Sequence, residues 1–190
     1  MRFPDILIIG AMKAGTTSLY MDLTQHERVF FTDDKEPHAL SSDDVLSDEG
    51  RQAYADHYRR AEPSQLCCDA STAYTKRRDY DGMAERAAQI LPPDYKAIYL
   101  VRHPIERIIS QHHHEHTMGL VGPSIDQAVA EHARYVQYSS YAYQLRPWID
   151  AIGMERIAVV RFEDYVARRQ EVVGELVDFL GLDAADYHGD

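Results

Sequence analysis

The chain has 190 residues, of which 45% are hydrophobic, and this is sufficient for one domain with a buried core. Its formal net charge of −11 argues against nonspecific binding to anionic membranes or nucleic acid, so no nucleic-acid partner is expected. The same charge makes a highly sulfated or phosphorylated polymer an unfavourable substrate, unless a local basic cleft overrides the average.

Short runs rich in β-branched and aromatic residues predict strands that are buried on both faces, as in a parallel sheet. These runs are Phe3–Ile9, Arg28–Thr32, Gln65–Cys68, Lys96–Val101 and Arg156–Phe162. Helical patterns alternate with them at Thr16–His26, Asp48–Ala61, Gly82–Leu91, Pro104–Met118, Ile125–Tyr135, Ser139–Ile152 and Arg168–Leu180. This alternation predicts an α/β fold with an open, mainly parallel five-stranded sheet flanked by helices. Residues 1–190 are expected to form a single domain.

Cysteine usage and hydropathy bear on the cellular compartment. The two cysteines, Cys67 and Cys68, are adjacent and adjacent cysteines rarely bridge each other, so a reducing compartment is expected. No signal-peptide pattern precedes the first strand, and no apolar stretch is long enough to span a bilayer. We therefore expect a cytoplasmic protein without a transmembrane segment. The sequence does not determine the oligomeric state.

The stretch IIGAMKAGTTSLY, residues 8–20, predicts an anion-binding loop. Gly10 and Gly15 have the spacing of a nucleotide-binding G-x-x-x-x-G-K-[ST] loop, but Thr16 stands at the lysine position and Lys13 lies earlier. Backbone N–H groups at the positive end of the following helix can surround a phosphate. The residues expected to bind it are Lys13, Ala14, Gly15, Thr16, Thr17 and Ser18. The simpler interpretation is a strand-to-helix turn with a capping threonine.

The stretch RHPIERIIS, residues 102–110, predicts a second anion site after the strand Lys96–Val101. A magnesium-dependent kinase or nucleotidase usually holds its metal with an aspartate at the end of such a strand, whereas Arg102 stands there. Arg102 can bind a phosphate through two parallel hydrogen bonds, and Ser110 can add a hydroxyl. The alternatives are a surface ion pair for Arg102 and a structural pair for Arg107. We expect a ligand with two separated phosphate groups and no metal ion.

A third unusual stretch, KEPH at Lys35–His38, follows the strand Arg28–Thr32. In an open α/β sheet, ligands bind beyond the carboxyl ends of the strands. The three stretches are therefore expected to converge at one edge of the sheet.

The segments KAGTTSL and VRHPIERIIS resemble the two cofactor signatures of the sulfotransferase family. KEPH is similar to a segment of the branch that includes glycosaminoglycan sulfotransferases and many bacterial relatives. Residues 161–182, RFEDYVARRQEVVGELVDFLGL, are similar to a late strand and helix of that fold. The resemblance implies a P-loop-like sulfotransferase fold. It also implies the donor 3′-phosphoadenosine 5′-phosphosulfate (PAPS) and the product adenosine 3′,5′-bisphosphate (PAP).

The resemblance further implies metal-independent, in-line transfer of a sulfuryl group to a hydroxyl or amine of a small-molecule, lipid or carbohydrate acceptor. Lys13 would neutralise the leaving phosphate, and Arg102 with Ser110 would hold the 3′-phosphate. Glu36 matches the family's glutamate base, while His38 offers an imidazole suited to neutral pH. The alternative functions are a nucleotide kinase or nucleotidase with a degenerate loop, and an inactive nucleotide-binding relative.

Three further features have competing interpretations. HHHEH at His112–His116 suggests zinc, but a polar helix face or an acceptor-pocket lining is the preferred interpretation, because a third ligand is not evident. Asp69–Tyr74, DASTAY, resembles a segment beside the acceptor, although its small residues could form a tight turn. Relatives usually continue beyond the FLGL helix with a segment that closes over the 3′-phosphate. The chain is therefore expected to be a fragment or to have a reduced lid.

Overall fold

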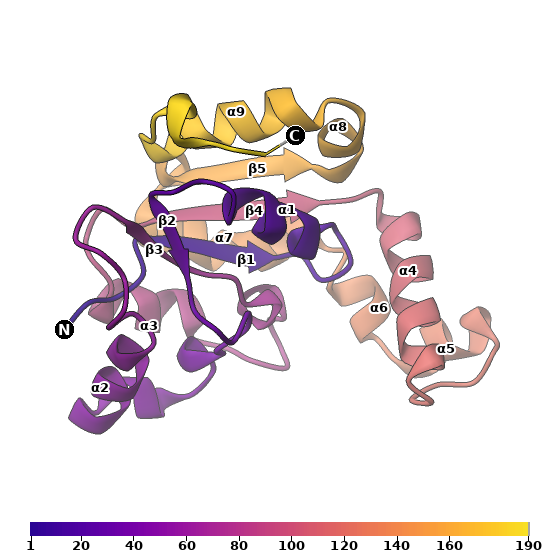
Figure 1. The fold of residues 1–190 in the computed structure, drawn as a ribbon. Helices are drawn as coiled ribbons and strands as arrows, with labels where there is room; N and C mark the ends of the chain where they lie inside the picture. The colour runs from indigo at the N-terminus through magenta and orange to yellow at the C-terminus, as the bar shows by residue number, and fades with distance from the viewer. Residues whose placement is uncertain (190) are drawn as a thin grey trace.

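The computed structural model describes residues 1–189, which form one parallel five-stranded sheet flanked by helices (Figure 1). The strands are β1 Ile6–Gly10, β2 Val29–Phe31, β3 Leu66–Asp69, β4 Lys96–Val101 and β5 Ile157–Arg161. Their order is β2-β3-β1-β4-β5, and every neighbouring pair is parallel. All residues of the central strand β1 are buried, as expected for an apolar run covered on both faces. The predicted fold class is confirmed.

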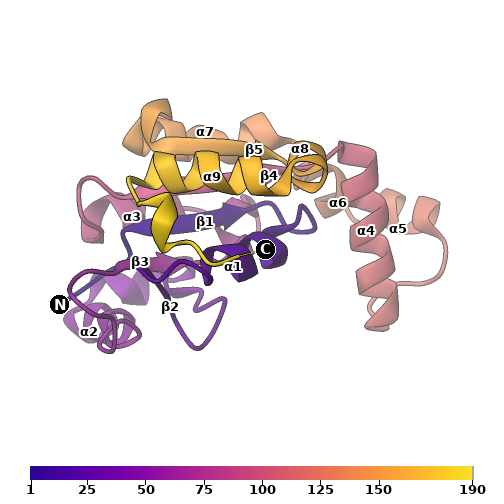
Figure 2. The same ribbon diagram turned by 45° about the horizontal axis from the view of Figure 1, so that its top comes forward.

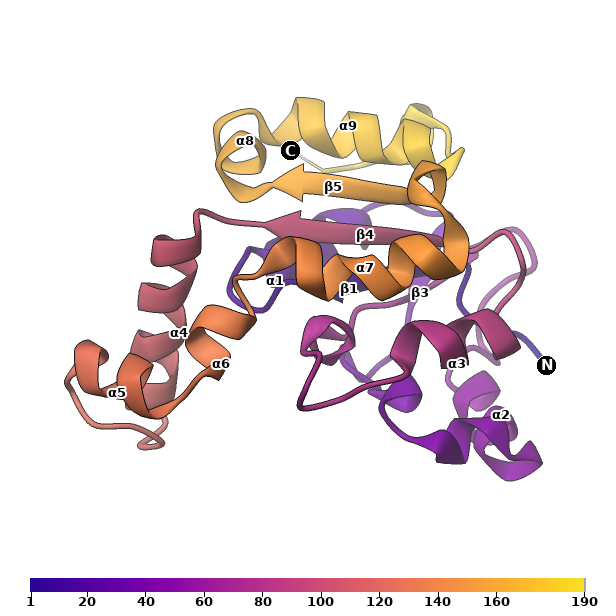
Figure 3. The ribbon, with the colours of Figure 1, turned by 180° about the vertical axis from the view of Figure 1, so that it is seen from behind.

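The helices form a layer on each face of the sheet. They are α1 Thr16–Leu23, α2 Asp48–Asp56, α3 Met83–Ile90, α4 Pro104–Thr117, α5 Ile125–Glu131, α6 Arg134–Gln137, α7 Tyr141–Ile152, α8 Phe162–Ala167 and α9 Arg169–Leu180. α1 and α9 lie on one face, while α3 and α7 lie on the other (Figures 1 and 3). Short 3-10 turns occur at Ala39–Ser41, Asp43–Leu46, Thr72–Thr75, Met154–Arg156 and Ala184–Asp186.

Most predicted elements differ from the observed ones only at their ends, whereas two differ in kind. Phe162, predicted as the end of the last strand, instead begins α8, whose first turn carries Glu163 and Asp164. Carboxylates are favoured at the positive end of a helix, and this explains why the helix starts immediately after β5. The predicted helix Ile125–Tyr135 is two helices, because His132 has an extended backbone that ends α5.

The sheet order places the loops after β1 and β4 side by side. In the sheet, β3 and β2 lie on one side of β1, and β4 and β5 lie on the other side. Such a reversal of strand order creates a crevice at the carboxyl ends of the two strands. The helices α4, α5 and α6 project beyond this edge, away from the sheet (Figure 2).

Candidate functional site

Two glycines shape the loop that follows β1. Gly10 has φ +140°, and a Cβ there would lie 2.0 Å from Thr75 Oγ1. Gly15 caps α1 with φ +93°, and a Cβ there would lie 2.7 Å from Cδ2 of Phe162. A larger residue would therefore both strain the backbone and collide with neighbouring side chains at either position. The close packing of this loop therefore requires glycine at both positions.

The N-terminal end of α1 is open for a ligand. No side chain caps this helix, and the first N–H groups of an α-helix have no partner within it. Thr16 is buried, whereas the side chains of Thr17 and Ser18 are exposed. The N–H of Ala14 is already used, because it donates to the carbonyl of Ala11 at 3.1 Å. The amides available to an anion therefore begin at the helix start rather than at Ala14.

Lys13 lies in the same loop with an unusual backbone. Its φ of +68° is in the left-handed region, which residues other than glycine rarely adopt. None of the ion pairs within residues 1–189 involves Lys13, so its charge is not neutralised by a neighbouring carboxylate. A strained backbone of this kind is often found at functional sites.

Arg102 faces the loop of Lys13 from the end of β4. Its Nη1 donates to the carbonyl of Lys13 at 3.4 Å, and its guanidinium lies 4.8 Å from the ring centre of Phe162. The backbone is fixed by Tyr141, whose hydroxyl donates to the Arg102 carbonyl at 2.6 Å and accepts from its N–H at 3.3 Å. The surface ion pair, which was the alternative interpretation of Arg102, is present but loose, with 3.8 Å between Nη2 and Oε2 of the exposed Glu106.

These groups surround one cavity of about 250 Å³. It is lined by Lys13, the stretch from Gly15 to Ser18, Arg102, Ser110 and Phe162. Ala14 is not part of the lining, because its side chain is fully buried. The two stretches predicted to bind anions therefore line one cavity at the carboxyl edge of the sheet, so convergence is confirmed for these two, whereas the third stretch, KEPH at Lys35–His38, does not line this cavity. Phe162 was missed because its sequence pattern indicates a strand.

Arg107 has a structural role. It is fully buried, and its guanidinium donates to Ser139 Oγ at 2.6 Å, to Gln111 Oε1 at 2.9 Å and to the Tyr135 carbonyl at 2.6 Å. Burial lowers its pKa, which nearby tyrosines and Glu115 partly oppose. These bonds join α4 to α6 and hold the projecting helices together, so Arg107 is not available to a ligand.

Glu36 is a half-buried carboxylate with several donors. Thr72 donates to its Oε2 through both the hydroxyl at 3.1 Å and the backbone N–H at 3.4 Å. Lys35 Nζ lies 3.1 Å from Oε1, and His38 Nε2 lies 3.6 Å from Oε2. Burial alone would raise the pKa of Glu36, but Lys35, Thr72 and His38 together bring it below its ordinary value. The group is therefore ionised at neutral pH and able to accept a proton.

A buried hydrogen-bond network supports the segment after Glu36. Asp69 at the end of β3 is fully buried, and it accepts from the hydroxyls of Tyr54 at 2.7 Å, Tyr74 at 2.6 Å and Ser71 at 2.7 Å. Burial raises its pKa, although these hydrogen bonds and His38 oppose the increase. Ser71 Oγ in turn accepts from the N–H of His38 at 3.3 Å, where φ is +55°. The DASTAY segment therefore positions the KEPH loop.

The histidine run does not form a metal site in the described part of the chain. Within residues 1–189 there is no group of three or more His, Cys, Asp and Glu side chains placed to hold a metal ion. His112 Nε2 and His116 Nδ1 instead lie 3.1 Å from the carbonyls of Gly122 and Val121. Their rings are stacked at 6.0 Å on the surface of α4. The histidines therefore lie on the polar surface of α4, whereas Glu115 is buried and accepts from Arg134 Nη2 and from the Tyr135 hydroxyl, both at 2.7 Å.

A family model described as "Sulfotransferase domain" matches residues 3–188, so the chain belongs to the sulfotransferase family. It is 29% identical over 191 residues to heparan sulfate glucosamine 3-O-sulfotransferase 6 of Homo sapiens, covering 95% of this chain and 53% of that protein. It is also 24% identical over 206 residues to the bifunctional heparan sulfate N-deacetylase/N-sulfotransferase 1 of Mus musculus, covering 98% of this chain and 23% of that protein. The chain thus spans about half the length of the first relative and less of the second.

Solved sulfotransferase structures share the fold. A sulfotransferase from Alicyclobacillus acidocaldarius matches with a TM-score of 0.87 and 24% identity, covering all of this chain and 85% of that one. The mouse sulfotransferase SULT7A1, solved with PAP, matches with a TM-score of 0.65 and 16% identity, covering 95% of this chain and 59% of that one. The family expected from the two signatures is confirmed.

Proposed function

We propose that residues 1–190 act as a single sulfotransferase domain that moves a sulfuryl group from PAPS to a hydroxyl or amine of a carbohydrate, lipid or other small acceptor. The observation that carries this proposal is the cavity in which the open end of α1, Lys13 and Arg102 meet. Family membership supports the same chemistry. A glycan acceptor is supported by the names of the relatives, which are sulfotransferases of heparan sulfate.

The residues that line the cavity fit the two charged ends of the donor. Lys13, the amides at the start of α1 and the hydroxyls of Thr16, Thr17 and Ser18 would bind the 5′-phosphosulfate. Arg102 and Ser110 would bind the 3′-phosphate, with the guanidinium oriented by its contact with Phe162. In PAPS the sulfuryl group is attached to the 5′-phosphate, and this phosphate leaves as part of PAP. Binding of PAPS by these cations, amides and hydroxyls needs no metal ion.

The reaction needs stabilisation of the charge on the leaving phosphate and removal of a proton from the acceptor. As the bond between sulfur and the acceptor oxygen or nitrogen forms, the bond from sulfur to the leaving phosphate oxygen breaks, and negative charge grows on that oxygen. Lys13 and the helix amides stabilise this charge. A carboxylate oxygen of Glu36 takes the proton from the acceptor. We assign the base to Glu36 rather than His38. Thr72 holds Glu36 in place, and Lys35 is the leading group that lowers its pKa against the effect of burial, whereas the His38 side chain is 48% exposed.

A cytoplasmic location is part of the proposal, and the free, buried state of Cys67 and Cys68 is consistent with it. Within residues 1–189 no helix is long and apolar enough to cross a membrane. The second candidate function, a nucleotide kinase, is disfavoured because β4 is followed by Arg102, where a metal-binding aspartate would be expected.

Calorimetry with PAP tests the proposed donor site. We expect binding of equal affinity in the presence of magnesium and of a chelator, because both phosphates are bound by protein cations and amides. Transfer of labelled sulfuryl from PAPS to a panel of acceptors then tests the reaction. A strict magnesium requirement, or turnover of ATP without transfer from PAPS, would favour the kinase. PAP binding without transfer to any acceptor would favour an inactive relative.

Arg102→Ala is expected to weaken PAP binding by about 10- to 100-fold, because a hydrogen-bonded charge pair contributes roughly 1.5–3 kcal/mol. At saturating PAPS the turnover should change little, since the 3′-phosphate carries the same charge throughout the reaction. Titration calorimetry measures the affinity. Arg146→Ala is the matched control, because Arg146 is 71% exposed and pairs with Asp150. Equal affinity of Arg102→Ala and wild type would refute the two-phosphate assignment.

A further inference from the structure

Arg102 lies in the short turn between β4 and α4, and this turn borders two cavities. One is the cavity of Lys13 and Arg102, which we call the donor cavity. The other has a volume of about 330 Å³ and is lined by residues 101–104, Tyr141, Arg161 and Glu163. Because open space adjoins this turn, packing holds it less firmly than it holds the core of the sheet. The conformation of the turn therefore depends on hydrogen bonds.

One side-chain hydroxyl holds both backbone polar groups of Arg102. The hydroxyl of Tyr141, the first residue of α7, donates to the Arg102 carbonyl at 2.6 Å and accepts from the Arg102 N–H at 3.3 Å. The last residue of β4 that pairs with β5 is Val101, so Arg102 lies beyond this ladder of the sheet. Backbone groups without a partner are costly where water is excluded. Tyr141 therefore fixes the backbone from which the Arg102 side chain projects.

Tyr141 is itself held in place. Its ring packs edge-on against the ring of Tyr99 in β4, with 6.0 Å between the ring centres. Two residues earlier, Ser139 Oγ lies 3.4 Å from the carbonyl oxygen of Pro104 and accepts from Arg107 Nε at 2.6 Å. The chain that enters α7 is therefore joined to β4 and to the start of α4. This gives the Tyr141 hydroxyl a fixed position relative to Arg102.

A second side chain holds the same turn from α8. Glu163 Oε1 accepts from the N–H of His103 at 2.8 Å. This hydrogen bond is the leading reason why the pKa of the exposed Glu163 lies below its ordinary value. Phe162, beside Glu163 in the chain, lies against the Arg102 guanidinium, which is 4.8 Å from the ring centre. The helices α7 and α8 thus hold the turn and the guanidinium of Arg102 together.

Tyr141 and Glu163 do not line the donor cavity, whereas Arg102 does. Their effect on a nucleotide bound there would therefore pass through Arg102. A guanidinium binds a phosphate through two parallel hydrogen bonds, and this geometry is lost when the guanidinium turns or shifts. Recognition of a phosphate by Arg102 thus depends on how rigidly the turn is held.

We propose that Tyr141 and Glu163 are positioning residues for Arg102, and that the turn they hold determines how strongly the protein distinguishes a nucleotide with a 3′-phosphate from one without it. The two hydrogen-bonding side chains fix the backbone, and the guanidinium is thereby aligned with the 3′-phosphate. Binding of the 5′-phosphate by the loop of Lys13 does not depend on these contacts. This inference rests on the proposed function, because that function assigns Arg102 to the 3′-phosphate.

Two nucleotides that differ by a single phosphate test the proposal. Calorimetry compares PAP with adenosine 5′-phosphate, which lacks the 3′-phosphate and is measured in competition with PAP. We expect wild type to bind PAP about 10- to 100-fold more tightly, the ratio expected from a charged hydrogen-bonded pair. Tyr141→Phe should lower this ratio about threefold to tenfold, the contribution of a neutral hydrogen bond, and leave the affinity for adenosine 5′-phosphate unchanged. The KM for PAPS should rise correspondingly, with little change in kcat.

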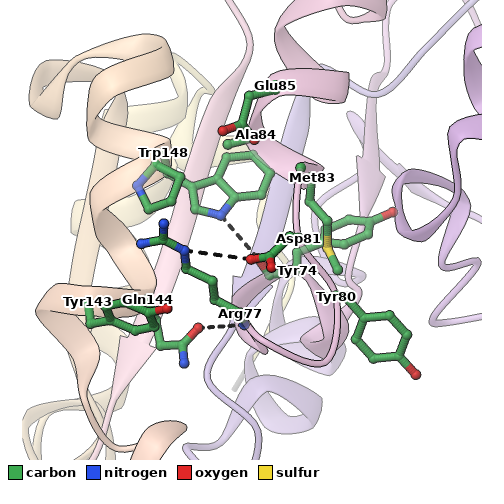
Figure 4. Close-up of a pocket in the computed structure, with 12 residues that line it drawn as sticks. Tyr74, Arg77, Tyr80, Asp81, Met83, Ala84, Glu85, Tyr143, Gln144 and Trp148 are labelled. Atoms are coloured by element: carbon green, nitrogen blue, oxygen red, sulfur yellow. Dashed lines mark hydrogen bonds and ion pairs between the residues drawn. The ribbon is translucent and has the colours of Figure 1, made fainter.

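Tyr143→Phe is the matched control, because it removes a hydroxyl from the same helix. The Tyr143 ring contacts Arg77 in a separate cavity of about 210 Å³ between α3 and α7, with 4.5 Å between the guanidinium and the ring centre (Figure 4). This substitution should leave the ratio of the two affinities equal to that of wild type. Trp148, the only tryptophan of the chain, is buried on α7, so its fluorescence reports whether each variant keeps this helix folded.

Two further comparisons show whether the effect passes through Arg102. Tyr141→Phe combined with Arg102→Ala should give the same ratio as Arg102→Ala alone, because the group that Tyr141 positions is already absent. Glu163→Ala should give a lower ratio than Glu163→Gln, since the amide oxygen of glutamine can still accept from the His103 N–H. Both Glu163 variants lose the same charge, so their difference measures the hydrogen bond.

The outcomes separate the inference from the function on which it rests. An equal loss of affinity for both nucleotides in Tyr141→Phe, an unchanged ratio, or a further loss in the double variant overturns the positioning role. If Tyr141→Phe does not fold, the two Glu163 variants decide, because Glu163 holds the same turn, and equal ratios then overturn the proposal. Wild type that binds neither nucleotide overturns the proposed function instead. Wild type that binds both equally overturns the assignment of Arg102 to the 3′-phosphate, on which the inference rests.

Discussion

Lys13→Ala is expected to lower kcat by about 10²–10³-fold, the usual loss when one stabilising donor is removed from a developing charge. The Lys13 ammonium has no carboxylate partner within residues 1–189, and it belongs to the loop that surrounds the open end of α1. Its charge is needed most when the leaving phosphate gains negative charge. Turnover should therefore fall more than the affinity for PAPS, in which the bridging oxygen does not yet carry that charge.

Single-turnover kinetics at varied PAPS concentrations measure the two effects separately, as the maximal rate and as the apparent Kd for PAPS. Lys13→Arg is the matched variant, because it keeps the charge while changing the shape of the donor group. We expect its turnover to lie between those of wild type and Lys13→Ala. Lys13→Ala protein that turns over normally but binds PAPS poorly would show that Lys13 contributes ground-state binding only.

Glu36→Gln is expected to lower kcat by about 10²–10⁴-fold, the range for loss of a general base. The amide keeps the shape of the side chain and can still contact Thr72, so the affinity for PAP should stay close to that of wild type. Transfer assays and calorimetry measure both quantities. Thr72→Val is a useful companion, because it removes the hydroxyl that donates to Glu36 and should produce a smaller loss.

The pH dependence distinguishes the two candidate bases. The pKa of Glu36 lies below its ordinary value, because Lys35, Thr72 and His38 outweigh the effect of burial. A base must be deprotonated to act, so activity that depends on Glu36 should be constant through neutral pH and fall only in acid. An imidazole base would instead lose activity as the pH falls through the neutral range. Normal turnover of Glu36→Gln with an inactive His38→Ala would transfer the assignment to His38.

The sequence by itself determined the strand and helix pattern and the backbone of the loop after β1, because both depend on residues that are close together in the chain. The alternation of apolar strands and helices is a local signal, and it predicted the positions of all five strands. The spacing of Gly10 and Gly15 reflects backbone conformations that other residues reach with difficulty, so the loop could be recognised from a short motif. Ligands bind beyond the carboxyl ends of the strands in a parallel sheet, and this rule predicted from sequence that Lys13 and Arg102 lie at the same edge.

Tertiary structure decided which side chains meet across long stretches of chain. Thr72 holds Glu36 although 36 residues separate them, and no local pattern indicates this contact. Arg102 and Arg107 occur in one motif, but packing leaves Arg102 in the cavity and buries Arg107 among the helices α4 and α6. Phe162 lines the cavity of Lys13 and Arg102 as the first residue of α8, where the apolar pattern suggested the end of a strand. Local sequence sets backbone conformation, whereas the partners of a side chain depend on how distant elements pack.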